Sequence, residues 1–229
     1  MPGIIILLFL ILISSVLAVA VFLWFKFARY PIPVWLFFCS LLAGATSFFP
    51  ALLLHGLISA EGNLGVIIRA LTEEISRIPL LIILFFIIRK NLFKESKSIN
   101  VSSSESESDT AYNHIFSVLA ASALVVGLGF TVLEGAVYSA ANPDITLTRA
   151  CTAAFIHAAC ASRVGYSVAV FRYRPISSFA QFLFAVLIHG VYNIMLLLPG
   201  SFSFIAAILL ALSAFFSSVV KIRSGMKKV

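Results

Sequence analysis

The chain has 229 residues, of which 61% are hydrophobic and only 11% are charged, and its mean hydropathy is +1.09. A water-soluble domain of this size needs more charge on its surface, so the composition excludes one and indicates a polytopic membrane protein. The formal net charge is +7, but the basic residues gather beyond the ends of apolar segments, which argues for contact with a lipid bilayer and against nucleic-acid binding.

Apolar stretches long enough to cross a bilayer follow one another along the chain. A transmembrane helix needs about 20 apolar residues. By that measure we predict about seven crossings, at residues 4–25, 34–57, 65–88, 115–140, 149–171, 179–198 and 202–220. The sequence therefore predicts an all-α transmembrane helix bundle that forms a single domain over residues 1–229.

The basic residues predict the orientation of this bundle. They follow the first, third, fifth and last crossings, as Lys26, Arg29, Arg89, Lys90, Lys94, Lys97, Arg172, Arg174, Lys221, Arg223, Lys227 and Lys228. The loops between the other crossings, SAEGN, ANPDITLT and LLPGS, carry no Lys or Arg. All the basic sites lie on one side if the N-terminus is outside and the C-terminus is cytoplasmic, which predicts a multi-pass protein of the cell membrane.

A polar segment separates the third crossing from the fourth. Its sequence, ESKSINVSSSESESDTAYN, is rich in serine and charge and almost free of large apolar residues. Such a composition is typical of a solvated spacer. We therefore predict a flexible cytoplasmic linker over residues 91–113.

Three charged residues lie inside the third crossing, in the stretch LTEEISRIPLL (71–81). A charged side chain near the bilayer centre costs about 2.5 to 3.5 kcal/mol, so Glu73, Glu74 and Arg77 together need a reason to be there. Arg77 lies four residues after Glu73 and three after Glu74, so it can pair with either carboxylate. The adjacent carboxylates repel each other unless one is protonated or paired with a cation. A purely structural network would not need both, which favours a functional site.

Three later crossings carry ionisable residues at a similar depth. With the N-terminus outside, Glu73 and Glu74 lie about 12 to 14 Å below the outer surface, at 1.5 Å per residue. Glu134, His157 and His189 lie about six, eight and nine residues from the outer ends of their own crossings. We therefore expect these five side chains to meet in the outer half of the membrane.

The residues around this set predict its supporting contacts. Asn193 lies one turn after His189, and Phe130 lies one turn before Glu134, so each pair shares a helix face. Gly127 comes seven residues before Glu134, on nearly the same face, where it lets another helix approach closely.

Each of these residues also has a structural alternative. A lone histidine such as His157 often serves only as a hydrogen-bonding partner between helices. Glu134 can simply neutralise Arg77 or Arg149. We expect His55, near the outer end of the second crossing, to lie at the membrane interface. Arg163, deep in the fifth crossing, is expected to extend inward or to pair, and no functional role is assigned to it.

The predicted set contains the groups needed to activate water. A glutamate can act as general base, and a histidine or Asn193 can stabilise a tetrahedral oxyanion. The sequence has no plausible Ser–His–acid set and no HExxH helix. We expect no obligatory cofactor, although zinc bound by one glutamate and two histidines stays open, because catalytic zinc sites use such ligands.

Four motifs occur in an order that resembles a known family. They are EEISR, GLGFTVLEGAVY, RACTAAFIHAACASRVGY and HGVYN. The set resembles the PrsW family of intramembrane proteases, which is related to the CAAX prenyl endopeptidases and bacteriocin-processing membrane proteins. The resemblance covers roughly residues 65 to 195, and it places the catalytic core helices in residues 65–198.

The family pattern is EExxK, FxxxE and HxxxD, each on its own helix. Its first motif is matched by Glu73, Glu74 and Arg77, where arginine replaces the family's lysine. The other two motifs are matched by Phe130 with Glu134 and by His189 with Asn193, where asparagine replaces aspartate.

The resemblance implies a glutamate-dependent peptidase that cleaves a membrane-anchored protein near the extracytoplasmic face. An anti-sigma factor is the substrate that it suggests. Carried over to this sequence, Glu73 or Glu74 activates the water and His189 assists, while Glu134 and His157 complete the site.

Two other functions fit the same sequence. One is a non-catalytic scaffold related to the Aph subunit of gamma-secretase, which would keep its partners when Glu73 or Glu74 is replaced by glutamine. The other is a small proton-coupled transporter, since intramembrane carboxylates and histidines also mark such paths. The clustering of the polar residues at one depth argues against the transporter.

Overall fold

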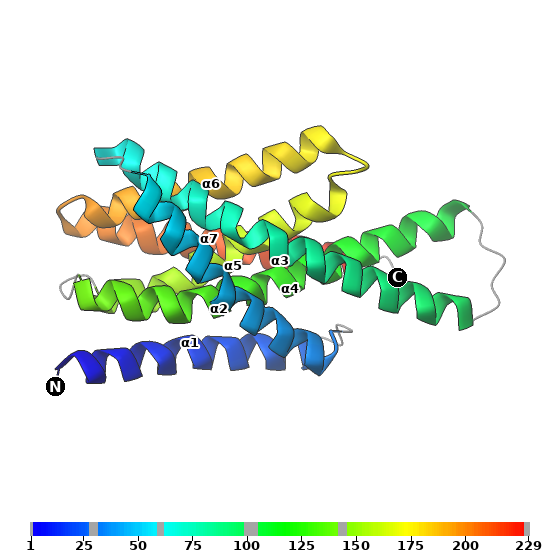
Figure 1. The fold of residues 1–229 in the computed structure, drawn as a ribbon, viewed down its shortest axis with the longest axis horizontal. Helices are drawn as coiled ribbons and strands as arrows, with labels where there is room; N and C mark the ends of the chain where they lie inside the picture. The colour runs from blue at the N-terminus through cyan, green and yellow to red at the C-terminus, as the bar shows by residue number, and fades with distance from the viewer. Residues whose placement is uncertain (1, 28–31, 59–61, 99–104, 142–145, 227–229) are drawn as a thin grey trace.

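The computed structural model describes residues 2–27, 32–58, 62–98, 105–141 and 146–226. Within these ranges every secondary-structure element is a helix, and there are seven of them (Figure 1). They are α1 (Pro2–Phe27), α2 (Val34–Leu57), α3 (Gly62–Ser98), α4 (Glu105–Ala141), α5 (Thr146–Val170), α6 (Pro175–Leu197) and α7 (Ser201–Met226). The predicted all-α class is confirmed.

Five stretches in the described part of the chain are long and apolar enough to cross a membrane. They are Val34–Leu57, His114–Val137, Thr152–Val170, Pro175–Leu197 and Ser201–Ser224. The described apolar part of α1, Val16–Phe27, is shorter. Charged residues interrupt the apolar sequence of α3, which keeps this helix out of the group. A membrane-spanning bundle is therefore supported, whereas the number of about seven crossings and the side of each terminus stay predictions.

Helices α3 and α4 extend beyond the crossings predicted for them. α3 continues to Ser98 and α4 begins at Glu105, and both ends project past the other helices (Figure 1). Much of the predicted linker over 91–113 is thus helical, and its central residues 99–104 lie outside the described residues. The single domain over 1–229 stays a prediction.

Helix α4 lies at the centre of the bundle. Every residue from Ile115 to Thr131 is buried, and α1, α2, α3, α5 and α7 all pack against it. Glycines make this packing close, because a Cβ added to Gly127 would collide with the backbone carbonyl of His157. A Cβ on Gly44 of α2 would collide in the same way with the carbonyl oxygen of Val126. The predicted close helix approach at Gly127 is confirmed, and it brings α5 against α4 at the level of His157.

The outer helices present large apolar side chains to their surroundings. Leu53 of α2, Ile176 of α6 and Phe202 of α7 are 70%, 86% and 87% exposed. Such exposure would be costly in water, but it suits helices whose outer faces contact lipid. In contrast, the described ionisable residues Glu73, Glu74, Glu134, His157 and His189 are buried in the interior.

Candidate active site

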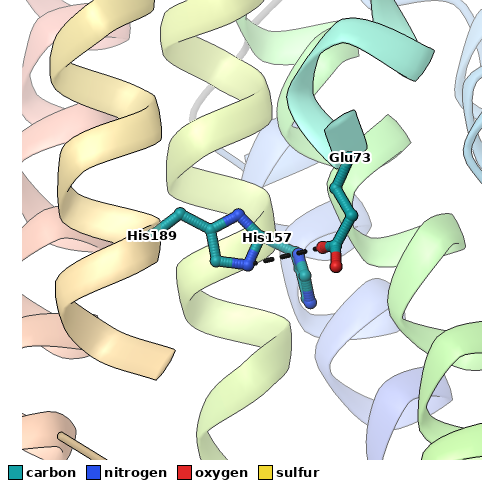
Figure 2. Close-up of side chains that lie close together, drawn as sticks. All are labelled: Glu73, His157 and His189. Atoms are coloured by element: carbon teal, nitrogen blue, oxygen red, sulfur yellow. Dashed lines mark ion pairs between the residues drawn. The ribbon is translucent and has the colours of Figure 1, made fainter. Parts of the chain in front are cut away.

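Five ionisable residues from four helices meet inside the bundle. Glu73 and Glu74 come from α3, Glu134 from α4, His157 from α5 and His189 from α6, and each is less than 9% exposed. Figure 2 shows Glu73, His157 and His189 pointing toward one another from three helices. The structure therefore brings together the whole catalytic set expected from the sequence, while the role of each member stays a prediction.

His189 lies between the two adjacent glutamates of α3. Its Nδ1 lies 2.8 Å from Glu74 Oε1, and its Nε2 lies 3.4 Å from Glu73 Oε2. Because a carboxylate only accepts hydrogen bonds, Nδ1 carries a proton and donates it to Glu74. In the neutral imidazole, Nε2 then presents a lone pair toward a second carboxylate. That arrangement is repulsive unless a proton or a metal cation lies between the two atoms.

Arg77 neutralises Glu74 and orients His157. Its Nη1 donates to Glu74 Oε1 over 2.5 Å, and its Nη2 donates to His157 Nδ1 over 3.0 Å. The sequence spacing allowed Arg77 to pair with Glu73 or Glu74, and in the structure it pairs with Glu74. The guanidinium carbon also lies 4.2 Å from the centre of the Phe130 ring. These contacts hold a fully buried charge in one position.

Glu134 links His157 to Arg149. His157 Nδ1 accepts a hydrogen bond from Arg77, so the ring proton is on Nε2. This Nε2–H donates to Glu134 Oε2 over 3.0 Å. Glu134 Oε1 accepts from Arg149 Nη2, and Arg149 Nη1 donates to Asn193 Oδ1 over 3.5 Å. Neutralisation of Arg149 by Glu134, which the sequence left open, is thus present in the structure beside the contact with His157.

A cavity of about 410 Å³ opens beside this set. Its volume is in the range of small-molecule sites. The cavity is lined by Phe48, Ala51, Leu52, His55, Val66, Arg69, Glu73, Phe130, Glu134, Val137, Arg149, Asn193 and Leu197. Glu73 and Glu134 are the acidic residues on its wall, so they are the described carboxylates that a substrate would meet first.

His55 and Arg69 are site residues that the sequence analysis missed. His55 Nε2 lies 3.7 Å from Glu73 Oε1 and 3.4 Å from the backbone oxygen of Arg69. His55 was expected at the membrane interface, which stays a prediction; the structure shows it partly exposed and lining the cavity together with Arg69. Its predicted depth was the signal available, because the sequence places His55 and the other ionisable residues toward the same end of the bundle.

Comparison with known proteins identifies the family. A protein-family model described as "PrsW family intramembrane metalloprotease" matches residues 6–220 of the chain. This chain belongs to the PrsW family. The resemblance found in residues 65–195 is confirmed, and the match includes the flanking helices as well. No curated protein and no solved structure matches the chain in these comparisons. Membership of the PrsW family supports an intramembrane protease and leaves its catalytic type open.

The PrsW family is described as metalloproteases, and one group of residues in the described chain could hold a metal ion. Glu73, His157 and His189 each offer one ligand atom, and these atoms lie within 4.8 Å of one another. All three residues are buried. Two histidines and one glutamate form a ligand set found in catalytic zinc sites, and the fourth position there is left to water.

Proposed function

We propose that this PrsW-family protein hydrolyses a peptide bond of a membrane-anchored protein near the extracytoplasmic face of the cell membrane. One observation carries the proposal. Glu73 Oε2 and His189 Nε2 are buried, face each other over 3.4 Å, and have no hydrogen-bond partner among the described residues. Buried polar atoms normally have partners, so this pair is the place where a bound group is expected.

The chemistry of these donor atoms suits a divalent metal ion. Glu73 and His189 would hold it, and His157 would join them through a ring nitrogen that now contacts Arg77 or Glu134. The donor set of one carboxylate and two imidazoles suits zinc. When bound, the metal supplies a Lewis acid that polarises a carbonyl group and makes a bound water more acidic.

Glu74 has two roles in this proposal. Its Oε1 accepts from His189 Nδ1, which fixes the tautomer that leaves Nε2 free as a ligand. Its Oε2 is buried and has no hydrogen-bond partner among the described residues. We assign to Oε2 the proton taken from the attacking water, a general-base role worth about 10²- to 10⁴-fold in rate.

The outer wall of the cavity provides groups that can stabilise the substrate. Asn193 accepts from Arg149 through its Oδ1, which leaves its amide N–H groups to donate to the carbonyl oxygen of the scissile bond. A donor placed at a developing oxyanion contributes about 3 to 4 kcal/mol. Glu134 holds Arg149 and His157 in position around this point.

The substrate must expose an extended backbone in the cavity. A transmembrane helix satisfies its own carbonyl groups and shields them from attack, so a segment that contains Gly or Pro is the better target. The cavity volume of about 410 Å³ suits a short extended segment. We propose a single-pass protein as the substrate, and the family resemblance suggests an anti-sigma factor.

Reconstitution in liposomes tests the proposal. The purified protein is mixed with candidate single-pass proteins from the same cell, and cleavage is followed for the wild type, Glu74→Gln and His189→Ala. Cys160→Ala is the matched control, because this buried residue of α5 contacts the backbone oxygen of Ala185 and lies outside the proposed chemistry. We expect cleavage by the wild type and the control and none by the two site variants. Equal cleavage by all four proteins would contradict the site assignment.

A further inference from the structure

A buried arginine also lies in the other half of the bundle, away from the candidate active site. Arg163 of α5 is 9% exposed, and it lies about 10 Å before the end of its helix at Val170. Its Nη1 donates to Gln181 Oε1 over 3.2 Å, and its Nη2 donates to Ser217 Oγ over 3.0 Å. Its guanidinium carbon also lies 4.7 Å from the centre of the Phe184 ring. All of these contacts are made with neutral groups.

A lysine lies close to this arginine. Lys221 follows Ser217 by one turn of α7, and its Nζ lies 3.7 Å from the centre of the Tyr166 ring. Tyr166 itself is three residues after Arg163 on α5. The structure therefore places two cations one helical turn apart along the contact between α5 and α7, each against an aromatic face.

No described carboxylate compensates these cations. The acidic residues whose side chains the structure describes are Glu73, Glu74 and Glu134, and all three belong to the candidate active site. The Nε of Arg163 is buried and has no hydrogen-bond partner among the described residues. Two cations at a helix contact are costly to keep without a counter-charge, and the described residues supply none, so the pair is a candidate site for a bound anion.

We propose that Arg163 and Lys221 bind the phosphate group of an anionic phospholipid. The guanidinium of Arg163 carries N–H groups beyond the two that donate to Gln181 and Ser217, and guanidinium groups suit phosphate geometry well. Phe184, Phe216 and Val220, which flank the pair, are 47%, 59% and 64% exposed. Their side chains offer an apolar surface for acyl chains, which a soluble phosphate would not use. The bound lipid would join α7 to α5 and α6.

Thermal unfolding in detergent micelles tests this lipid site. We expect phosphatidylglycerol to raise the Tm of the wild type by about 5 °C more than phosphatidylcholine does. The double variant Arg163→Gln/Lys221→Gln should lose this difference. The matched control is Arg172→Gln/Arg223→Gln, which removes two exposed cations and should keep it. An unchanged difference in the first double variant would overturn the proposal, and so would an equal rise of Tm with inorganic phosphate alone.

A second measurement covers the case in which the double variant does not fold. Native mass spectrometry of the wild type, purified from membranes, should show a retained anionic phospholipid. The single variant Lys221→Gln should retain at most about a tenth as much. A wild type without retained anionic lipid, or a variant that retains it fully, would overturn the proposal.

Discussion

Arg77 and Arg163 are both buried inside the bundle, yet their surroundings are opposite. Arg77 contacts a carboxylate and an imidazole within a network that includes every acidic side chain the structure describes. Arg163 contacts an amide, a hydroxyl group and an aromatic ring. The first environment is a network of ionisable groups in which Glu73 Oε2 and His189 Nε2 face each other over 3.4 Å. The second is a pair of cations without a described partner of opposite charge, so the two halves of the bundle are expected to bind different things.

The largest expected effect is on catalysis. Glu74→Gln should lower kcat/KM by about 10³-fold, because glutamine cannot accept the proton from water. Arg223→Gln, at the exposed end of α7, should leave kcat/KM within about twofold. Kinetics with one reconstituted substrate measure both values. A similar loss of kcat/KM in the two variants would contradict the assignment of catalysis to the half of the bundle that contains Glu74.

The next effect compares the two arginines directly. Arg77→Gln leaves Glu74 buried beside His189 without its cation, which should cost about 3 to 5 kcal/mol of unfolding free energy. Arg163→Gln leaves no described carboxylate unpaired, so it should cost about 1 kcal/mol in detergent without anionic lipid. Denaturation of the two variants under one condition gives the difference. Equal destabilisation would show that Arg163 has a counter-charge of its own.

Close helix packing behind the site gives a smaller effect. Gly127→Ala places a methyl group against the backbone carbonyl of His157, so α5 must move, at a cost of about 1 to 3 kcal/mol. The control is Gly56→Ala in α2, where a Cβ meets no atom within 4 Å. We expect the control to be as stable as the wild type or slightly more stable. Thermal unfolding measures both, and an unchanged Tm in Gly127→Ala would contradict the packing described for α4 and α5.

The smallest effect is expected at the family's aspartate position. Asn193→Asp adds a carboxylate 3.5 Å from Arg149, which strengthens this contact by about 1 kcal/mol or less at a partly buried position. Because Glu134 already neutralises Arg149, we expect kcat/KM to change by less than about fivefold. A loss as large as that of Glu74→Gln would mean that the amide group itself is essential.

The sequence predicted which residues meet in the site better than it predicted which side chains pair with one another. Equal depth along four helices was enough to bring Glu73, Glu74, Glu134, His157 and His189 together, because an α-helix has a fixed rise per residue. Spacing could not decide whether Arg77 pairs with Glu73 or Glu74, since positions three and four residues away both lie on its face.

Two other features lay beyond what the sequence pattern could show. His55 carried no motif, and its contact with Glu73 depends on how α2 packs against α3, a tertiary property. The helical end of α3 and the helical start of α4 were missed because both segments are polar. A loss of apolar residues shows where a helix leaves the lipid, and it does not show where the helix ends. The backbone can remain helical well beyond that point.

The metal content of the purified protein is the decisive measurement for the candidate active site. We expect about one zinc ion or similar divalent metal ion per chain in the wild type and in Glu74→Gln. We expect less than about a tenth of that amount in Glu73→Gln and His189→Ala, which each remove a ligand. Elemental analysis of the four proteins gives the answer. An active wild type without stoichiometric metal, or full metal content in Glu73→Gln, would contradict the proposed metal site.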